Sequence, residues 1–171
     1  MRLFTALILA AGLLAGCASR ENSTPKAGNN APIPLADGFK VENYQGKVLL
    51  LNFWTTWCPP CRGELPDLVR LHRDFDTAKV AVVGISIDDR GTPEEIQAKL
   101  RQALTAYQID YPVFFDSKME LYQAFGTFPA IPTTFLIDAQ GQVRKVYEGA
   151  RSYAAFAQDI QDLLDGKKEE G

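Results

Sequence analysis

The stretch Asn52-Phe53-Trp54-Thr55-Thr56-Trp57-Cys58-Pro59-Pro60-Cys61 places two cysteines directly after an apolar run that begins at Val48. Because that run is continuously apolar, it predicts a β-strand that is buried on both faces. From Pro59 to about residue 76, apolar side chains recur at helical spacing, which predicts a helix. The two thiols therefore stand between a buried strand and a helix, where they can close a small disulfide ring or bind a metal ion.

The rest of the chain continues the alternation of strands and helices. A second buried strand is predicted at 79–87, and a helix begins with the capping pattern Thr92-Pro93-Glu94-Glu95. A strand–helix–strand order predicts parallel strands joined by a right-handed crossover. Further elements are expected as strands at 39–41, 111–115, 133–137 and 142–147, and as helices at 117–125 and 152–164. We predict one α/β domain over residues 38–165, followed by a frayed tail at 166–171.

Residues 1–16 have the form of a secretory signal peptide. A positive start is followed by an apolar run up to Leu14, which is shorter than the roughly 20 residues that a membrane span needs. The run Leu14-Ala15-Gly16-Cys17 resembles the bacterial lipobox, which implies that Cys17 carries a lipid and becomes the mature N-terminus. The alternatives are an ordinary signal peptide with a chance cysteine, or a cytosolic apolar helix.

Residues 17–37 are rich in Ser, Asn, Pro, Ala and Gly, so we expect a flexible tether between the lipid and the domain. The alternative is that 33–35 pack on the domain. The net charge of the chain is −3 and no basic block stands out, which argues against a nucleic-acid partner.

Export bears on the choice between a disulfide and a metal site. Disulfides persist outside the cytoplasm, and two cysteines supply only two of the four ligands of a structural zinc site, with no second CxxC in the chain. Asp88 and Asp89 lack a third acidic ligand nearby, and His72 is expected at a helix surface or in packing. We therefore expect no metal.

The start of a helix favours a thiolate, because unpaired N–H groups and the positive end of the helix dipole lie there. We expect Cys58 to be an exposed nucleophile. Cys61, one turn further, is expected to be more buried and to attack a mixed disulfide. Pro59 and Pro60 have no N–H to donate and stiffen the ring.

Phe53-Trp54, Trp57 and Cys58-Pro59-Pro60-Cys61 resemble the active site of the thioredoxin superfamily. The runs Arg62-Gly63-Glu64-Leu65-Pro66 and Pro132-Thr133-Thr134-Phe135-Leu136-Ile137-Asp138 are similar to its membrane-anchored, extracytoplasmic TlpA-like branch. The resemblance covers about residues 38–165. It implies a thioredoxin-like fold, with a central mixed β-sheet flanked by helices, and thiol–disulfide exchange with no cofactor beyond a redox-active Cys58–Cys61 disulfide.

The resemblance also assigns roles to single residues. It implies that Cys58 attacks and Cys61 resolves, and that Trp57 flanks the nucleophile, whereas Trp54 suits core packing. Pro132 matches the family's cis-proline, because it directly precedes a strand, and Pro129 is the rival. The loop Ile131-Pro132-Thr133 is then expected to lie against the CxxC and to pair with the substrate backbone.

Asn52 stands where many cytoplasmic thioredoxins have a buried aspartate that accepts protons. An asparagine does not titrate, and TlpA-like sequences commonly have one at this position. Glu64, three residues after Cys61, can take over proton transfer near the thiols. The alternative is that Glu64 is a solvated helix carboxylate.

Together these features predict an exported, lipid-anchored thiol–disulfide oxidoreductase that reduces oxidised protein thiols, including those of cytochrome c precursors. It is expected to be a monomer and to be recharged by a membrane-bound thiol electron donor. Ala18 follows Cys17, which implies the outer membrane in a Gram-negative cell. The alternatives are a peroxiredoxin-like peroxidase, for which Thr55 is present but the required proline is not, and a binding module with a structural disulfide.

Overall fold

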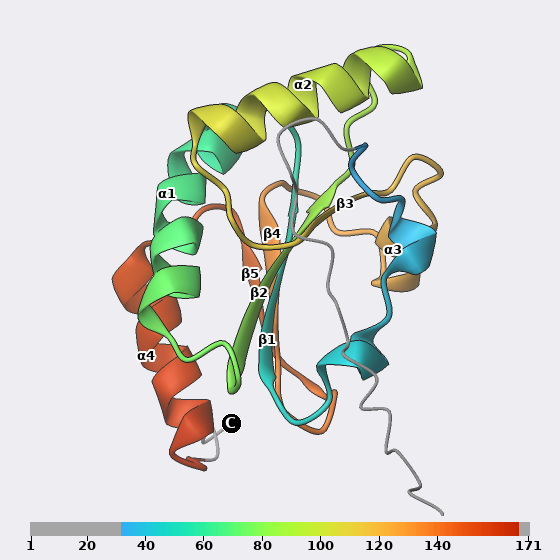
Figure 1. The fold of residues 1–171 in the computed structure, drawn as a ribbon. Coiled ribbons are helices and arrows are strands. Elements are labelled where there is room, and N and C mark those ends of the chain that lie inside the picture. Colours follow the sequence, from blue (N-terminus) through green and yellow to red (C-terminus); the bar gives the residue numbers. More distant parts are fainter. Residues whose placement is uncertain (1–31, 168–171) are drawn as a thin grey trace, which may run out of the picture.

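A five-stranded mixed β-sheet forms the centre of the computed structural model, which describes residues 32–167 (Figure 1). The strand order is β3-β2-β1-β4-β5, so β1, which leads into the two cysteines, is central. β1, β2 and β3 are parallel, whereas β4 runs antiparallel to both β1 and β5. This confirms the predicted mixed sheet. The strands are β1 Val48–Trp54, β2 Val80–Ser86, β3 Val113–Phe115, β4 Thr133–Ile137 and β5 Val143–Glu148.

Helices cover both faces of the sheet (Figure 1). Side chains of α1, α2 and α4 pack into one core together with alternate residues of β1, among them Leu50 and Trp54. The intervening β1 residues, such as Leu51 and Phe53, join a second core on the other face, against which residues of α3 pack. This alternation is the two-residue period of a strand. The helices are α1 Pro59–Asp74, α2 Pro93–Ala106, α3 Glu120–Ala124 and α4 Tyr153–Leu164.

The segment before β1 differs from the prediction. The strand expected at 39–41 is wrong, because two 3-10 helices, Ala36–Gly38 and Val41–Tyr44, occupy this region. Phe39 and Tyr44 stack with ring centroids 5.7 Å apart, and both belong to the second core. Two residues five positions apart point to opposite faces of a strand. The tighter turns therefore allow both rings to reach the same core.

Packed structure begins earlier than residue 38. Ile33 is buried in the first core, and its backbone N–H and C=O both bond the side-chain amide of Gln97 on α2. Leu35 forms a bridge with Phe115 at the edge of β3. Residues 33–37 are thus part of the domain, so the prediction that the tether extends to residue 37 is wrong.

Several predictions lie outside the described residues. These are the signal peptide at 1–16, lipidation of Cys17, the tether up to residue 31 and the tail from residue 168. No helix within residues 32–167 is long and apolar enough to cross a membrane.

Candidate functional site

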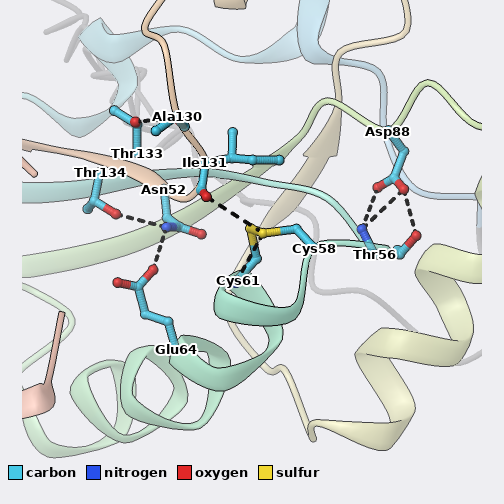
Figure 2. Close-up of a disulfide and its surroundings, with 10 residues drawn as sticks. All are labelled: Asn52, Thr56, Cys58, Cys61, Glu64, Asp88, Ala130, Ile131, Thr133 and Thr134. Carbon is cyan, nitrogen blue, oxygen red and sulfur yellow. Dashed lines mark hydrogen bonds between the residues drawn. A yellow bond between two sulfur atoms is a disulfide. The ribbon is translucent and has the colours of Figure 1, made fainter. Parts of the chain in front are cut away.

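The two cysteines form a disulfide at the N-terminus of α1 (Figure 2). Their Cα atoms are 5.3 Å apart, a usual separation for a disulfide. Cys58 is the residue that caps the helix, and its Sγ accepts a hydrogen bond from the Cys61 N–H at 3.2 Å. Because Pro59 and Pro60 have no N–H, the Cys61 N–H is the first donor that the helix offers to the sulfur.

The exposure expected for Cys58 is wrong for this disulfide form. Cys58 is 3% exposed and Cys61 is 1% exposed. Cys58 is covered from the side of Ile131, whose carbonyl oxygen lies 3.7 Å from the Cys58 Sγ (Figure 2). A disulfide sulfur has no hydrogen to donate, so this approach is a packing contact.

The loop before β4 confirms the choice between two prolines. The Ile131–Pro132 peptide bond is cis, and it is the only cis bond within the described part of the chain. The loop is held by the Thr133 Oγ1, which donates to the Ala130 carbonyl oxygen at 2.7 Å, and by the Gly149 N–H, which donates to the Pro132 carbonyl oxygen at 2.8 Å. Two neighbouring parts of the chain thus keep Ile131 against Cys58.

Asn52 and Glu64 form a buried polar group beside the disulfide (Figure 2). The Asn52 Nδ2 donates to the Glu64 Oε2 at 3.0 Å and to the Thr134 Oγ1 at 2.8 Å. The Arg151 N–H donates to the other carboxylate oxygen of Glu64 at 2.7 Å. Glu64 is 2% exposed, so the solvated carboxylate considered as an alternative is wrong.

Burial raises the pKa of Glu64 to about 7, because desolvation of the charged form outweighs the hydrogen bonds from Arg151 and Asn52. The carboxyl therefore changes its charge near neutral pH. Glu64 lies three residues after Cys61, which puts the two side chains on the same side of α1. This carboxyl is placed to hold or release a proton close to the thiols.

The two tryptophans have different surroundings. Trp54 is fully buried in the first core, as its assignment to packing predicts. Trp57 is half-buried, and the guanidinium carbon of Arg90 lies 3.6 Å from the centroid of its ring, the geometry of a cation–π contact. No feature of the sequence indicated this pairing, because 33 positions separate the two residues and Arg90 follows a different strand.

Asp88 fixes the loop that precedes the disulfide, a role that the sequence reasoning missed. It is 5% exposed, and its carboxylate accepts hydrogen bonds from the Thr56 N–H at 3.0 Å and the Thr56 Oγ1 at 2.6 Å (Figure 2). It also accepts a hydrogen bond from the Ser86 Oγ at 2.7 Å. Asp88 lies two residues after Ser86, the last residue of β2, which pairs with Trp54 at the end of β1. The sequence signal for this role was the position of Asp88 just after a predicted parallel strand, at the edge of the sheet where functional residues gather.

Replacing Asp88 by alanine is expected to lower the free energy of unfolding by about 2 kcal/mol, because buried donors lose a charged acceptor. Denaturant unfolding of the disulfide form measures this. Asp89→Ala is the matched control, since Asp89 is exposed, and it is expected to change stability by less than about 0.5 kcal/mol. Equal effects of the two substitutions would show that the Asp88 contacts do not stabilise the loop.

Metal binding finds no further support from the side chains. Within residues 32–167, no group of three or more His, Cys, Asp or Glu side chains is placed to hold a metal ion.

The comparisons with known proteins agree with this geometry. A model of the AhpC/TSA family matches residues 31–146. The chain belongs to the AhpC/TSA family. It is 31% identical to the thiol-disulfide oxidoreductase ResA of Bacillus subtilis, over 80% of this chain and 75% of that protein. These matches make it a thioredoxin-like thiol–disulfide oxidoreductase, as the resemblance to the TlpA-like branch predicted.

Solved structures show the same relationship. A thiol:disulfide interchange protein of the thioredoxin family from Chlorobium tepidum is 32% identical, with a TM-score of 0.65 over 78% of this chain and 97% of that one. The exposed lipoprotein thioredoxin Etrx1 of Streptococcus pneumoniae is 25% identical, with a TM-score of 0.61 over 78% of this chain and 98% of that one. The thioredoxin-like fold is thus confirmed for this oxidoreductase.

Proposed function

We propose that this oxidoreductase reduces disulfides of other proteins outside the cytoplasm. In the reduced chain the Cys58 thiolate attacks one sulfur of the partner's disulfide, and the partner's other sulfur leaves as a thiolate. The Cys61 thiolate then attacks the Cys58 sulfur, and the partner's first cysteine leaves reduced. Two electrons pass to the partner, and the Cys58–Cys61 disulfide forms. A membrane-bound thiol electron donor restores the dithiol.

The observation that carries the proposal is the position of Cys58 at the start of α1. Its sulfur receives one N–H from the helix, that of Cys61, and the positive end of the helix dipole lies there. Both favour the thiolate that attacks. Cys61 lies inside α1 and within bonding distance of Cys58, which suits a resolving cysteine that attacks the mixed disulfide.

The same local structure supports the reducing direction. Pro59 and Pro60 remove two N–H groups that a helix start otherwise offers to a thiolate. The buried carboxyl of Glu64 near the thiols also opposes a negative sulfur once it is ionised. A dithiol form that is less stabilised is a stronger reductant.

The Ile131 loop supports docking of the partner's backbone. Within residues 32–167, the N–H and C=O of Ile131 make no backbone–backbone hydrogen bond, and the carbonyl oxygen lies 3.7 Å from the Cys58 Sγ. An extended segment of the partner can pair with these groups, as a strand added to a sheet edge does. Trp57, which directly precedes Cys58 and is half-buried, would complete the docking surface.

The proposed location follows from the N-terminal sequence. The lipobox-like run before Cys17 supports a lipid anchor, and the relative from Streptococcus pneumoniae is described as an exposed lipoprotein. Ala18 after the lipidated residue favours the outer membrane if the cell is Gram-negative. Reduction of cytochrome c precursors is one use of such a protein, and we expect the protein to be a monomer.

The reduction potential tests the proposed direction. Equilibration of the purified chain with glutathione buffers is expected to give a potential near that of thioredoxin, about −270 mV, rather than the roughly −120 mV of the oxidant DsbA. A potential near the latter value would overturn the reducing direction. A disulfide that resists millimolar dithiothreitol would instead favour a structural bridge in a binding module.

Glu64→Gln is expected to change how stability depends on pH. The carboxyl has a folded pKa of about 7, above its ordinary value of 4.5, so the folded chain holds a proton that the unfolded chain releases in that window. The stability from this proton is present below pH 4.5 and is lost as the pH rises through 7. The variant has no such group. Its free energy of unfolding, relative to the wild type, should rise by about 3 kcal/mol from pH 4 to pH 8.

Denaturant unfolding of the disulfide form gives this difference without interference from titrating thiols. Glu148→Gln is the control, since Glu148 is exposed on β5, and a parallel pH profile is expected for it. In the reduced chain, Glu64→Gln should also shift the thiolate titration of Cys58 to lower pH. If neither profile of the Glu64 variant differs from the wild type, Glu64 does not act on the thiols.

A further inference from the structure

A groove lies beside the disulfide, between the loop that leads into Cys58 and one side of α2. Its volume is about 450 Å³. One wall contains Thr56 and Trp57, which directly precede Cys58, and Arg62, which directly follows Cys61. The opposite wall comes from α2 and the loop before it, through Arg90, Lys99, Gln102, Ala103, Ala106 and Tyr107. A molecule that reaches Cys58 along this side therefore contacts the groove.

The charge of the groove has one sign. Arg62, Arg90 and Lys99 are exposed cations, and no acidic side chain lines the groove. Within residues 32–167, none of these three makes an ion pair with a carboxylate. The cations therefore remain available in a chain whose net charge is −3. Such a concentration of one sign in a hollow attracts the opposite charge.

The position of Arg90 is fixed before any partner arrives. Its guanidinium lies over Trp57, and its carbonyl oxygen accepts a hydrogen bond from the Lys99 Nζ at 2.7 Å. The loop is held on one side by Asp88, which bonds Thr56, and on the other by the capping box of Thr92 and Glu95. A fixed cation loses less conformational entropy on binding than a free side chain does.

We propose that this groove binds an acidic segment of the partner protein, next to the cysteine that reacts with Cys58. The inference rests on the proposed function and names its substrate class. Charge complementarity selects carboxylates for Arg62, Arg90 and Lys99. The apolar lining of Ala103, Ala106 and Tyr107 receives the aliphatic or aromatic residues between them. The Ile131 loop lies against Cys58 itself and remains for the partner's backbone.

Two synthetic peptides, each with one internal disulfide, test the proposal. They are identical except that glutamates beside the cysteines of one are glutamines in the other. The reduced full chain is expected to reduce the acidic peptide about tenfold faster at low salt, and the preference should shrink as salt rises. The measured quantity is the ratio of the two second-order rate constants, which cancels any effect of a substitution on the thiols.

The variant Arg62→Gln/Arg90→Gln/Lys99→Gln is expected to bring this ratio close to one. Lys99→Glu alone is a single change at an exposed site of α2, and it should lower the ratio several-fold. This variant replaces the triple variant in the test if the triple variant folds poorly. Arg101→Gln is the matched control, because Arg101 lies on α2 outside the groove, and its ratio should equal that of the wild type.

The outcomes separate the two proposals. Equal rates for the two peptides in the wild type, or an unchanged ratio in the triple variant, would overturn the acidic groove and leave the proposed function in place. A reduced chain that reduces neither peptide would overturn both.

Discussion

Replacing Cys58 by serine is expected to lower the rate of protein disulfide reduction by on the order of 1000-fold or more, to the level of the buffer. The hydroxyl of serine does not ionise near neutral pH, so the attacking thiolate is lost. Cys61 does not take over, because Cys58 is the residue that caps α1 and that the Ile131 loop contacts, whereas Cys61 lies within the helix. Loss of partner thiol formation, followed with a thiol reagent, measures the effect.

Cys17→Ser is the matched control for this substitution. Cys17 is the one cysteine of the chain's three that lies outside the disulfide, and its proposed role is to carry the lipid. The purified Cys17 variant is therefore expected to reduce protein disulfides at the wild-type rate. If Cys58→Ser retains more than a few per cent of the activity, Cys58 is not the nucleophile.

Phe53→Ala is expected to have the largest effect on stability. Phe53 is fully buried on β1, and its ring lies 5.0 Å from that of Phe128 and 5.7 Å from that of Phe135, centroid to centroid. Truncation to alanine leaves a cavity in the second core. Such changes cost about 3–5 kcal/mol. Denaturant unfolding of the disulfide form should show this loss as a lower midpoint with an unchanged slope.

Phe53→Leu separates the cavity from the chemical change. Leucine fills much of the space without a ring, so this variant is expected to lose only about 1–1.5 kcal/mol. If Phe53→Ala costs less than about 1 kcal/mol, the second core does not hold β1 in place.

The strands and helices around the site could be predicted because their signals are local. The apolar run before Asn52 predicts a strand and the capping pattern at Thr92 predicts a helix start. Each signal lies within a short stretch of sequence. The cis bond at Pro132 could not be predicted from the neighbouring residues, since most X–Pro bonds in folded proteins are trans. The family resemblance supplied it, and the structure confirmed it.

What the sequence could not predict depends on contacts between distant segments. The prediction that Cys58 is exposed was wrong because Ile131, 73 positions away, covers its sulfur. The hydrogen bonds from Thr56 to Asp88 join the ends of two strands, and they were missed because Asp88 was considered only as a metal ligand. The burial of Glu64 depends on Asn52 and on the backbone of Arg151, which no single stretch contains.

The most direct test of the account is a trapping experiment with Cys61→Ser. Without the resolving thiol, the reduced variant should form a stable mixed disulfide between Cys58 and an oxidised partner protein, and peptide mapping by mass spectrometry should place the bond at Cys58. If Cys58 is reactive toward alkylating reagents but no partner protein stays linked to it, the chain does not reduce protein disulfides through Cys58 and Cys61.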